Sequence, residues 1–253
     1  DVTDFIDRKE VRRLDPYAQY AIVAADQALL DSGIDMDKVD LADFGVIWGS
    51  GIGGAETFLS EALGFCEGGR IPRFNPFFIP KMIADIASGH ISMRHGLRGP
   101  NFTTVSACAS SSNAIIDAYN YIRLGQAIAF VTGGSEAALN EIGIGGFNAM
   151  KAISTRNEDY KTASRPFDVT RDGFVMGEGS GALIVEELEH ALARGAKIYA
   201  EIVGAGLSAD AHHLTAPHPD GLGAASVMER ALKDAEIDRE AIDYINVHGT
   251  FYF

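Results

Sequence analysis

Residues 102–125 read FTTVSACASSSNAIIDAYNYIRLG, and this stretch decides the fold. The run at 102–105 predicts a β-strand, and the pattern from about Ser110 to Leu124 predicts a helix closed by Gly125. Cys108 therefore falls in the turn between a strand and a helix. A strand that leads through a tight turn into a helix is typical of α/β proteins.

Cys108 lies where the free backbone amides at the start of a helix would stabilise a thiolate, the reactive form of cysteine. Capping groups for these amides are expected from residues 110–112 and from Asn113. An apolar stripe is expected to bury the helix against the sheet, and its members are Ile115, Tyr119 and Ile122. A cysteine on so rigid a support suits covalent catalysis, although a buried structural cysteine fits the position equally well.

The rest of the chain repeats the alternation of strands and helices. Strands are expected at 44–48, 127–131, 182–185, 198–203 and 243–247. Helices are expected at 16–30, 56–63, 186–193 and 222–235, with another that begins within 80–89, and a glycine-rich loop is expected to run as far as Gly146. Apolar strands that alternate with helices predict a layered α/β fold whose central sheet is covered on both faces.

Composition excludes several classes of protein. The 253 residues are 47% hydrophobic and 22% charged, which is ordinary for a globular protein. A formal net charge of −14 argues against a general nucleic-acid binder. No apolar run is long enough to span a bilayer, the first residues show no signal segment, and Cys66 and Cys108 form no disulfide framework. A cytoplasmic, reduced setting is therefore expected.

Residues 49–54 read GSGIGG and match the glycine pattern of a dinucleotide-binding loop. That interpretation also needs an acidic residue at the end of a second strand about 20 residues further on. Here that region, residues 65–70, reads FCEGGR and has no strand before it. The glycines are better explained by a backbone that turns tightly beside a narrow cavity. Cys66, within the same region, is interpreted as an incidental loop thiol.

His248 is the histidine best placed to handle protons for a nucleophile, because it follows a predicted strand at the edge where α/β folds place their sites. His90, His95 and His190 fall in helices or turns and are interpreted as packing or surface residues. Asp210 lies near His212, His213 and His218, but adjacent residues on a strand point in opposite directions. No metal site is therefore predicted.

A basic cluster near the start stands out against the acidic background. Its members are Arg8, Lys9, Arg12 and Arg13. At helical spacing the last three fall close to one face, which is either a solvated helix face or a docking site for an acidic partner.

Several segments in this order resemble the elongating β-ketoacyl-acyl-carrier-protein synthases of bacterial type II fatty-acid synthesis. They are VSACASS at 105–111, STRN at 154–157, SRPFD at 164–168, RDGFVMGEG at 171–179 and VHGT at 247–250. The resemblance implies the thiolase-like α-β-α-β-α layered fold, a homodimer, acyl-carrier protein as partner, and no cofactor or metal. It assigns 1–197 to the N-terminal half without its first strand, and 198–253 to a truncated start of the C-terminal half.

The resemblance also implies roles for individual residues. Cys108 would accept the acyl chain as a thioester, and malonyl-carrier protein would then lose CO2 and attack that thioester. His248 would stabilise the resulting enolate, and Thr250 would contact the phosphopantetheine arm. Ile52 would gate the acyl pocket and Phe147 would line the tunnel. Carrier-protein docking would fall to Lys9, Arg12, Arg13, Arg73 and Lys151.

The family pattern continues after VHGT with a lysine, a second histidine and a glycine loop that holds a phenylalanine, whereas this sequence reads Phe251-Tyr-Phe253 and stops. We therefore expect residues 1–253 alone to fold poorly and to be inactive. Two alternatives stay open, the first with the same motifs and the second with the same fold. One is a polyketide ketosynthase, and the other is a non-catalytic chain-length partner, against which Cys108 counts.

Overall fold

The structure is a computed structural model that describes residues 1–249. Contacts divide the chain into two units, which are described separately: Asp1–Phe147 with Met176–Lys197, and Asn148–Val175 with Ile198–Phe253. No helix among the described residues has the length and apolar character needed to cross a membrane.

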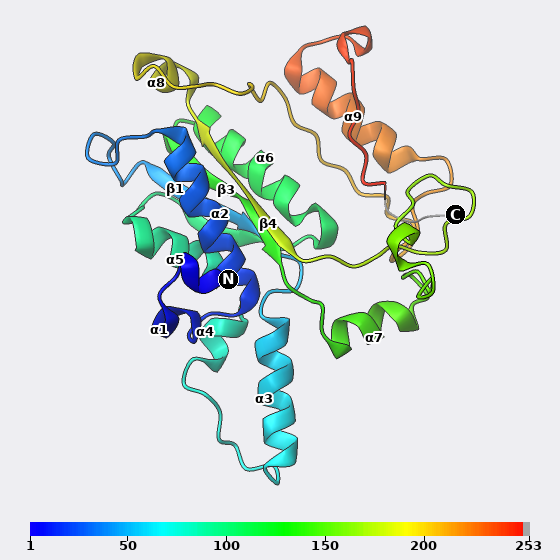
Figure 1. Cartoon of the computed structure of the whole chain (residues 1–253). Helices are drawn as coiled ribbons and strands as arrows, with labels where there is room; N and C mark the ends of the chain where they lie inside the picture. Colours follow the sequence, from blue (N-terminus) through cyan, green and yellow to red (C-terminus); the bar gives the residue numbers. More distant parts are fainter. Residues whose placement is uncertain (250–253) are drawn as a thin grey trace. The chain divides into compact units, whose positions relative to one another are not determined.

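The first unit is built on a four-stranded sheet in the order β2-β1-β3-β4 (Figure 1). Its strands are β1 (Phe44–Gly49), β2 (Asn101–Thr104), β3 (Ala129–Glu136) and β4 (Gly179–Glu186). β1 pairs in parallel with β2 and β3, whereas β4 runs antiparallel to β3. The strands predicted at 44–48, 102–105, 127–131 and 182–185 are confirmed.

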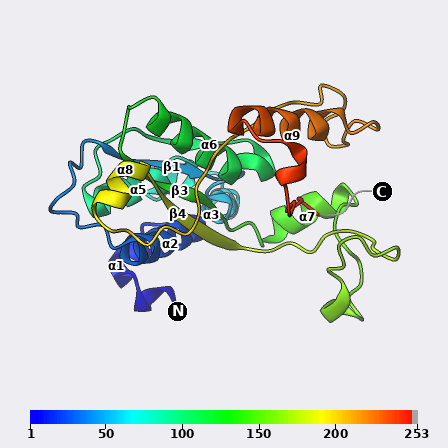
Figure 2. The ribbon, with the colours of Figure 1, turned by 90° about the horizontal axis from the view of Figure 1, so that it is seen from above.

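Helices cover both faces of this sheet, as the sequence predicts. In Figure 2, α2 (Pro16–Ser32) lies on one side of the strands and α6 (Ser110–Arg123) on the other. α5 (Ile86–His95) packs on the α2 side with α2, β1 and β2. The unit also contains α1 (Arg8–Val11), α3 (Ala55–Glu67), α4 (Phe78–Met82), α7 (Glu141–Ala149, whose last two residues fall in the second unit) and α8 (Leu188–Ala193).

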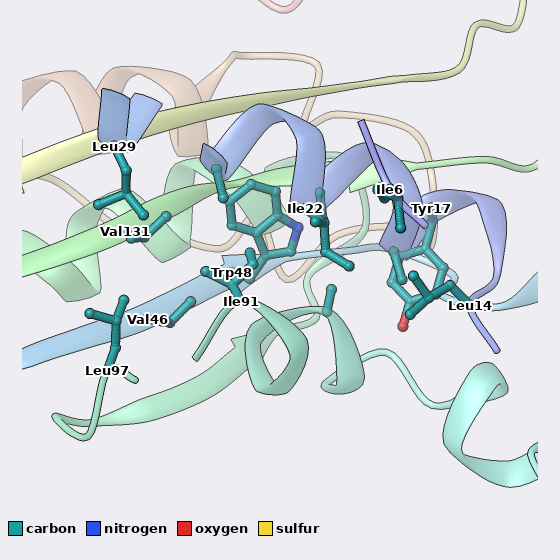
Figure 3. Packing of buried hydrophobic residues seen from close by; sticks show 14 of the residues in the cluster. Ile6, Leu14, Tyr17, Ile22, Leu29, Val46, Trp48, Ile91, Leu97 and Val131 are labelled. Atoms are coloured by element: carbon teal, nitrogen blue, oxygen red, sulfur yellow. The ribbon is translucent and has the colours of Figure 1, made fainter. Parts of the chain in front are cut away.

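The side chains of β1 and β3 alternate between two buried clusters. Trp48 and Val131 belong to the larger cluster under α2 and α5 (Figure 3), whereas Ile47 and Phe130 belong to the smaller one under α6. Trp48 is fully buried, and its Nε1–H donates to Ser135 Oγ at 3.0 Å. The sheet is thereby fixed from both sides.

Two helical predictions need correction. The helix expected to begin within 80–89 is split into α4 and α5, because Ile83 is extended and its carbonyl accepts a bond from the Tyr17 hydroxyl at 2.6 Å. The loop expected between the strand at 127–131 and Gly146 is much shorter, because β3 continues to Glu136 and helix α7 begins at Glu141. Asn140 precedes it, and its Oδ1 accepts a bond from Gly143 N at 2.9 Å, which starts the helix despite its glycines.

The second unit contains α9 (Leu222–Ala235), as predicted, but the strands expected at 198–203 and 243–247 are absent from its described residues. A strand needs a neighbouring backbone to pair with, and the described part of this unit supplies no strand ladder. The segment that follows residue 198 instead packs along α9. Ala205 N donates to Asp234 Oδ2 at 2.9 Å, and a Cβ at Gly204 would lie 2.6 Å from Ala231 O.

Candidate active site

Two glycines that face each other on neighbouring strands bring α6 close to the sheet. Gly49 ends β1 and is the register partner of Gly134 on β3. A Cβ at Gly49 would lie 2.5 Å from Ser111 N, and a Cβ at Gly134 would collide with Ser111 Oγ. The absence of both side chains therefore lets the start of α6 rest directly on the carboxyl ends of the strands.

This close approach corrects the predicted face of α6. Ser110, Ala114 and Ala118 are the buried residues of the helix, whereas Ile115 and Tyr119 are only half-buried. Ile122 does pack against the core cluster. Small residues face the sheet because the glycine pair leaves too little room for a larger side chain.

Cys108 lies in the turn Ala107–Ala109, a single 3₁₀ turn between β2 and α6. Ala107 has φ +51°, a left-handed conformation that is uncommon for a residue with a side chain. Such a conformation persists only where surrounding bonds enforce it, and it is concentrated at functional sites.

Hydrogen bonds from β2 and α6 enforce that turn. Thr104 Oγ1 donates to Ser110 O at 2.7 Å, and Ser110 Oγ donates to Ala107 O at 2.7 Å while accepting from Ser106 N at 2.9 Å. Asn113 Nδ2 donates to Ser106 Oγ at 2.7 Å. Ser110 and Asn113 therefore brace the turn before the helix. The prediction that 110–113 cap the helix is wrong, because α6 has no side-chain cap.

Cys108 itself is exposed, which removes the alternative of a buried structural cysteine. Cys66 is also exposed, but it lies in helix α3 rather than in a loop, and the structure gives it no comparable bracing. An accessible sulfur on a rigid turn at a helix start has the geometry that a nucleophile requires. The catalytic role of Cys108 stays a prediction.

The GSGIGG segment forms a turn whose amides point at a carboxylate of the same chain. Glu136, at the end of β3, accepts bonds at Oε2 from Gly51 N at 2.8 Å and from Ile52 N at 3.0 Å. In a dinucleotide-binding loop such amides would face a pyrophosphate. Here an anion of the protein already occupies them, which agrees with the tight-turn interpretation.

Ile52 is half exposed at the tip of this turn. The neighbouring Gly51 is close to the cysteine turn, since a Cβ there would lie 3.4 Å from Ala107 O. The structure therefore brings the Ile52 turn and the Cys108 turn together, although they are far apart in sequence. Phe147 is placed half-buried on α7.

Four of the predicted docking residues lie in the first unit, and all are exposed: Lys9, Arg12, Arg13 and Arg73. The guanidinium of Arg13 lies 5.1 Å from the ring centre of Phe77, four residues after Arg73. Helix α1 ends at Val11, so Arg12 and Arg13 follow it and do not share a helix face with Lys9. Glu10 of α1 pairs with Arg94 of α5 at 3.3 Å. The basic helix α1 is thereby held against the body of the unit.

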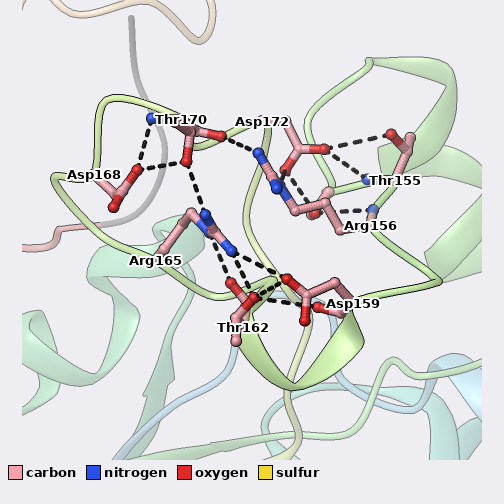
Figure 4. A network of polar contacts seen from close by, with 9 residues as sticks. Thr155, Arg156, Asp159, Thr162, Arg165, Asp168, Thr170 and Asp172 are labelled. Carbon is pink, nitrogen blue, oxygen red and sulfur yellow. Dashed lines mark hydrogen bonds and ion pairs between the residues drawn. The ribbon is translucent and has the colours of Figure 1, made fainter.

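His248 and Lys151 lie in the second unit, and both are exposed. A Cβ at Gly249, next to His248, would lie 3.6 Å from the ring of Phe167. Phe167 has φ +65° and belongs to a loop that polar contacts hold together (Figure 4). Thr250 lies outside the described residues.

The loop of Figure 4 contains two of the motifs that carry the resemblance, STRN and SRPFD. Arg156 bonds to Asp172 at 3.3 Å and to Thr170 O at 2.5 Å. Arg165 Nη1 donates to Thr170 Oγ1 at 2.8 Å. Polar contacts between residues of these motifs thus hold the loop together, and Phe167 of this loop lies next to Gly249.

The described residues contain no group of three or more histidine, cysteine or acidic side chains suited to a metal ion. His212 and His218 have ring centres 4.9 Å apart, and the main-chain N–H of His218 donates to the carboxylate of Asp210. These contacts shape the loop before α9.

Sequence reasoning missed Glu136 and Gly134, although both lie in one short segment. Residues 132–136 read TGGSE, and paired glycines followed by an acid directly after a buried strand were the available signal. Their partners at 49–53 come from a different strand, so only the sheet order reveals the contact.

Two family models match the chain in succession. Residues 2–191 match the beta-ketoacyl synthase N-terminal domain, and residues 199–251 match the beta-ketoacyl synthase C-terminal domain.

Relatives and solved structures agree with these models. The chain is 48% identical to 3-oxoacyl-[acyl-carrier-protein] synthase 2 of Staphylococcus aureus over 98% of its own length and 61% of that protein. It superposes on a beta-ketoacyl synthase from Burkholderia phymatum STM815 with a TM-score of 0.86 at 37% identity, over 96% of this chain and 59% of that one. The chain therefore spans about 60% of the length of the curated relatives it matches.

A further solved structure is a type II PKS acyl-carrier protein in complex with its ketosynthase. The TM-score is 0.88 at 33% identity, over 92% of this chain and 59% of that one. The superpositions confirm the predicted thiolase-like α/β fold class.

Proposed function

The chain belongs to the beta-ketoacyl synthase family, and from that premise we propose that it is the Cys108-bearing part of a 3-oxoacyl-[acyl-carrier-protein] synthase. The reaction is the decarboxylative condensation of malonyl-carrier protein with an enzyme-bound acyl chain during fatty-acid elongation. The single observation that carries the proposal is the exposed Cys108 on a turn braced by Thr104, Ser110 and Asn113.

In the first half-reaction the Cys108 thiolate attacks the carbonyl carbon of an acyl thioester, and the thiolate of the carrier leaves. In the second, a malonyl thioester loses CO2, and the electron pair left behind attacks the acyl carbonyl on Cys108. The carbon–carbon bond forms as the Cys108 thiolate leaves, so no cofactor or metal is required.

His248 is assigned to stabilising the enolate oxygen that forms on decarboxylation, and Thr250 to contacting the phosphopantetheine arm. Support for both comes from the VHGT motif at 247–250. The exposure of His248 leaves its ring accessible to a substrate. Ile52 is assigned to the gate of the acyl pocket because its turn lies against the Cys108 turn, and Phe147 to the wall of the tunnel.

The partner is acyl-carrier protein, loaded with either an acyl or a malonyl group. The complex of a carrier protein with its ketosynthase among the structural neighbours supports this assignment. An acidic partner is attracted to Lys9, Arg12, Arg13, Arg73 and Lys151 on a chain whose net charge is −14.

A homodimer in the cytoplasm completes the proposal, with one thiolase-like half at 1–197 and the start of a second at 198–253. Two surfaces of the first unit support association with a second copy. The first is β2, an edge strand of the four-stranded sheet that can pair with another backbone. The second is the partly exposed α3–α4 segment, which carries the stacked rings of Phe65, Phe74 and Phe78.

The test uses the full gene product and acyl-carrier-protein thioesters, with the mass of the intact protein as readout. One acyl adduct is expected on the wild type and on Cys66→Ala, and none on Cys108→Ser. Addition of malonyl-carrier protein should then release a 3-oxoacyl product. A wild type that gains no adduct would overturn the synthase in favour of the chain-length partner, and a poly-3-oxo product would favour the polyketide ketosynthase.

A further inference from the structure

Glu136 is a half-buried carboxylate that the chemistry of condensation does not use. It lies at the end of β3 and contacts the turn that carries Ile52. We propose that Glu136 is a positioning residue that fixes the Ile52 turn against the Cys108 turn and so sets which acyl chain lengths Cys108 accepts. This inference rests on the proposed function, because it presumes that Cys108 carries an acyl chain.

The anchor of Glu136 is rigid. Its backbone is the last residue of β3, and it is in register with Gly179 of β4. The side chain therefore projects from the sheet rather than from a loop.

The turn donates three groups to this side chain. Oε2 accepts the amides of Gly51 and Ile52 at 2.8 and 3.0 Å, and the Ser50 hydroxyl donates to Oε1 at 3.4 Å. Ser50 Oγ in turn accepts from Gly53 N at 3.1 Å. One carboxylate thus satisfies the amides of residues 51 and 52 directly and that of residue 53 through Ser50.

The opposite side of the turn is also held. Gly54 N donates to Met82 O at 3.0 Å, and Gly53 adopts φ +77° where a Cβ would lie 3.1 Å from the Cα of Ala84. The turn is therefore clamped between Glu136 and the end of α4. If Glu136 is removed, one side of the clamp is lost, and the half-exposed Ile52 can shift next to Ala107.

Burial raises the pKa of the Glu136 carboxyl, while the amides of Gly51 and Ile52 oppose that rise. Ionised Glu136 therefore carries a desolvation cost that the amides only partly offset. A carboxyl group that is kept at this partly buried position and holds a turn at the proposed site fits the role of a positioning group.

Three variants separate positioning from general stability. Glu136→Ala removes both acceptors and leaves the turn amides unsatisfied. Glu136→Gln keeps one oxygen where Oε2 accepts both amides, presents its NH2 to Ser50 Oγ, and has no charge to desolvate. The matched control is Glu187→Ala, which removes another carboxylate that caps a backbone N–H, that of His190 in α8.

The full gene product is acylated with hexanoyl- and tetradecanoyl-carrier protein, and kcat/KM for the formation of the Cys108 thioester is measured for each. We expect Glu136→Ala to change the ratio of the two values by on the order of tenfold, because two charge-assisted hydrogen bonds that hold the turn are lost. Glu136→Gln should keep the wild-type ratio, and so should Glu187→Ala. Thermal midpoints are recorded for all the variants.

If Glu136→Ala does not fold, Ser50→Ala replaces it, with a smaller change of the ratio in the same direction. A wild-type ratio in a folded Glu136→Ala or Ser50→Ala, or an equal change of the ratio in Glu136→Gln, would overturn the inference. A wild type that is not acylated at all would instead overturn the proposed function, so the two failures are distinguishable.

Discussion

The two units of the chain keep their shape by different means. All the buried hydrophobic residues of the described chain except Ala163 belong to the first unit, and most of them form two clusters on opposite faces of its sheet. The second unit exposes large apolar side chains such as Phe167, Leu214 and Tyr244. Its loop at 148–175 is held by arginine–aspartate contacts.

The difference matters because each unit carries one of the two residues assigned to catalysis. Cys108 stands on close-packed strands and a braced helix start, so its position follows from core packing. His248 follows a segment without a strand ladder, beside a loop held by polar contacts near the surface. Such contacts open at lower cost than a packed core. Substitutions near Cys108 are therefore expected to reduce activity more than substitutions near His248.

The largest effect is expected from a cavity in the core of the first unit. Trp48→Ala should lower the free energy of unfolding by about 3–5 kcal/mol. The substitution replaces the largest fully buried side chain with a cavity and removes the hydrogen-bond donor to Ser135 Oγ. The measurement is urea unfolding followed by circular dichroism, because Trp48 is the only tryptophan and its fluorescence is lost in the variant. Tyr244→Ala in the second unit, 80% exposed, should cost less than about 0.5 kcal/mol. Equal costs would contradict the comparison.

The second largest effect is expected from a substitution at Gly49, which faces Gly134 beneath the start of α6. Gly49→Ala places a Cβ 2.5 Å from the backbone of Ser110 and Ser111, so α6 and the Cys108 turn must shift. A displacement on the order of 1 Å can reduce a rate about a hundredfold, which is the loss expected in Cys108 acylation. Gly64→Ala serves as control because nothing lies within 4 Å of its Cβ. An unchanged rate of acylation in Gly49→Ala would show that the facing pair of Gly49 and Gly134 does not position Cys108.

A smaller effect is expected in the polar loop of the second unit. Arg165→Met removes the bonds to Thr162 and Thr170 that hold the loop next to Gly249. Amide hydrogen exchange within 159–172 should quicken by roughly fivefold, the change expected when about 1 kcal/mol of hydrogen bonding is lost. Exchange in β1 and β3 should stay as in the wild type. Arg239→Ala breaks an exposed pair with Glu229 and should leave the loop unaffected.

The smallest effect concerns the pH dependence of the first unit. Burial lowers the pKa of His90 on α5, although Glu10 opposes the shift. The stability that neutral His90 contributes is therefore present above the ordinary histidine pKa of about 6.5 and is lost as pH falls through the lower pKa of the folded state. Between about pH 7.5 and about pH 5, the wild type should lose slightly more stability than His90→Gln. Parallel pH profiles in urea unfolding would contradict this.

The sequence predicted the structure correctly where the residues that determine an element lie close together in the chain. The strand at 44–48, the helix that ends at Ser32 before the left-handed Gly33, and the turn that holds Cys108 all follow from short-range spacing. Helix α9 matches its predicted bounds for the same reason. The predictions at 198–203 and 243–247 were wrong because an extended segment becomes a strand only when another backbone pairs with it.

Contacts between distant segments were decided by the tertiary structure. The sequence determined that Cys108 lies in a strand–helix turn, but it did not show that Gly49 and Gly134 face each other beneath that turn. Nor did it show that Ala114 and Ala118, rather than Ile115 and Tyr119, face the sheet. The space available to a side chain depends on what packs above it, and that is fixed only when the sheet is assembled.

The GSGIGG segment shows the same limit most clearly. Its letters determine a tight turn with free amides, and that much is common to a nucleotide-binding loop and to this protein. The choice between the two depends on Glu136, a carboxylate 85 residues from Gly51 in sequence. β3 pairs with β1 and carries that carboxylate to the amides. Spacing within the sequence specifies the donors, and only the order of the strands specifies the acceptor.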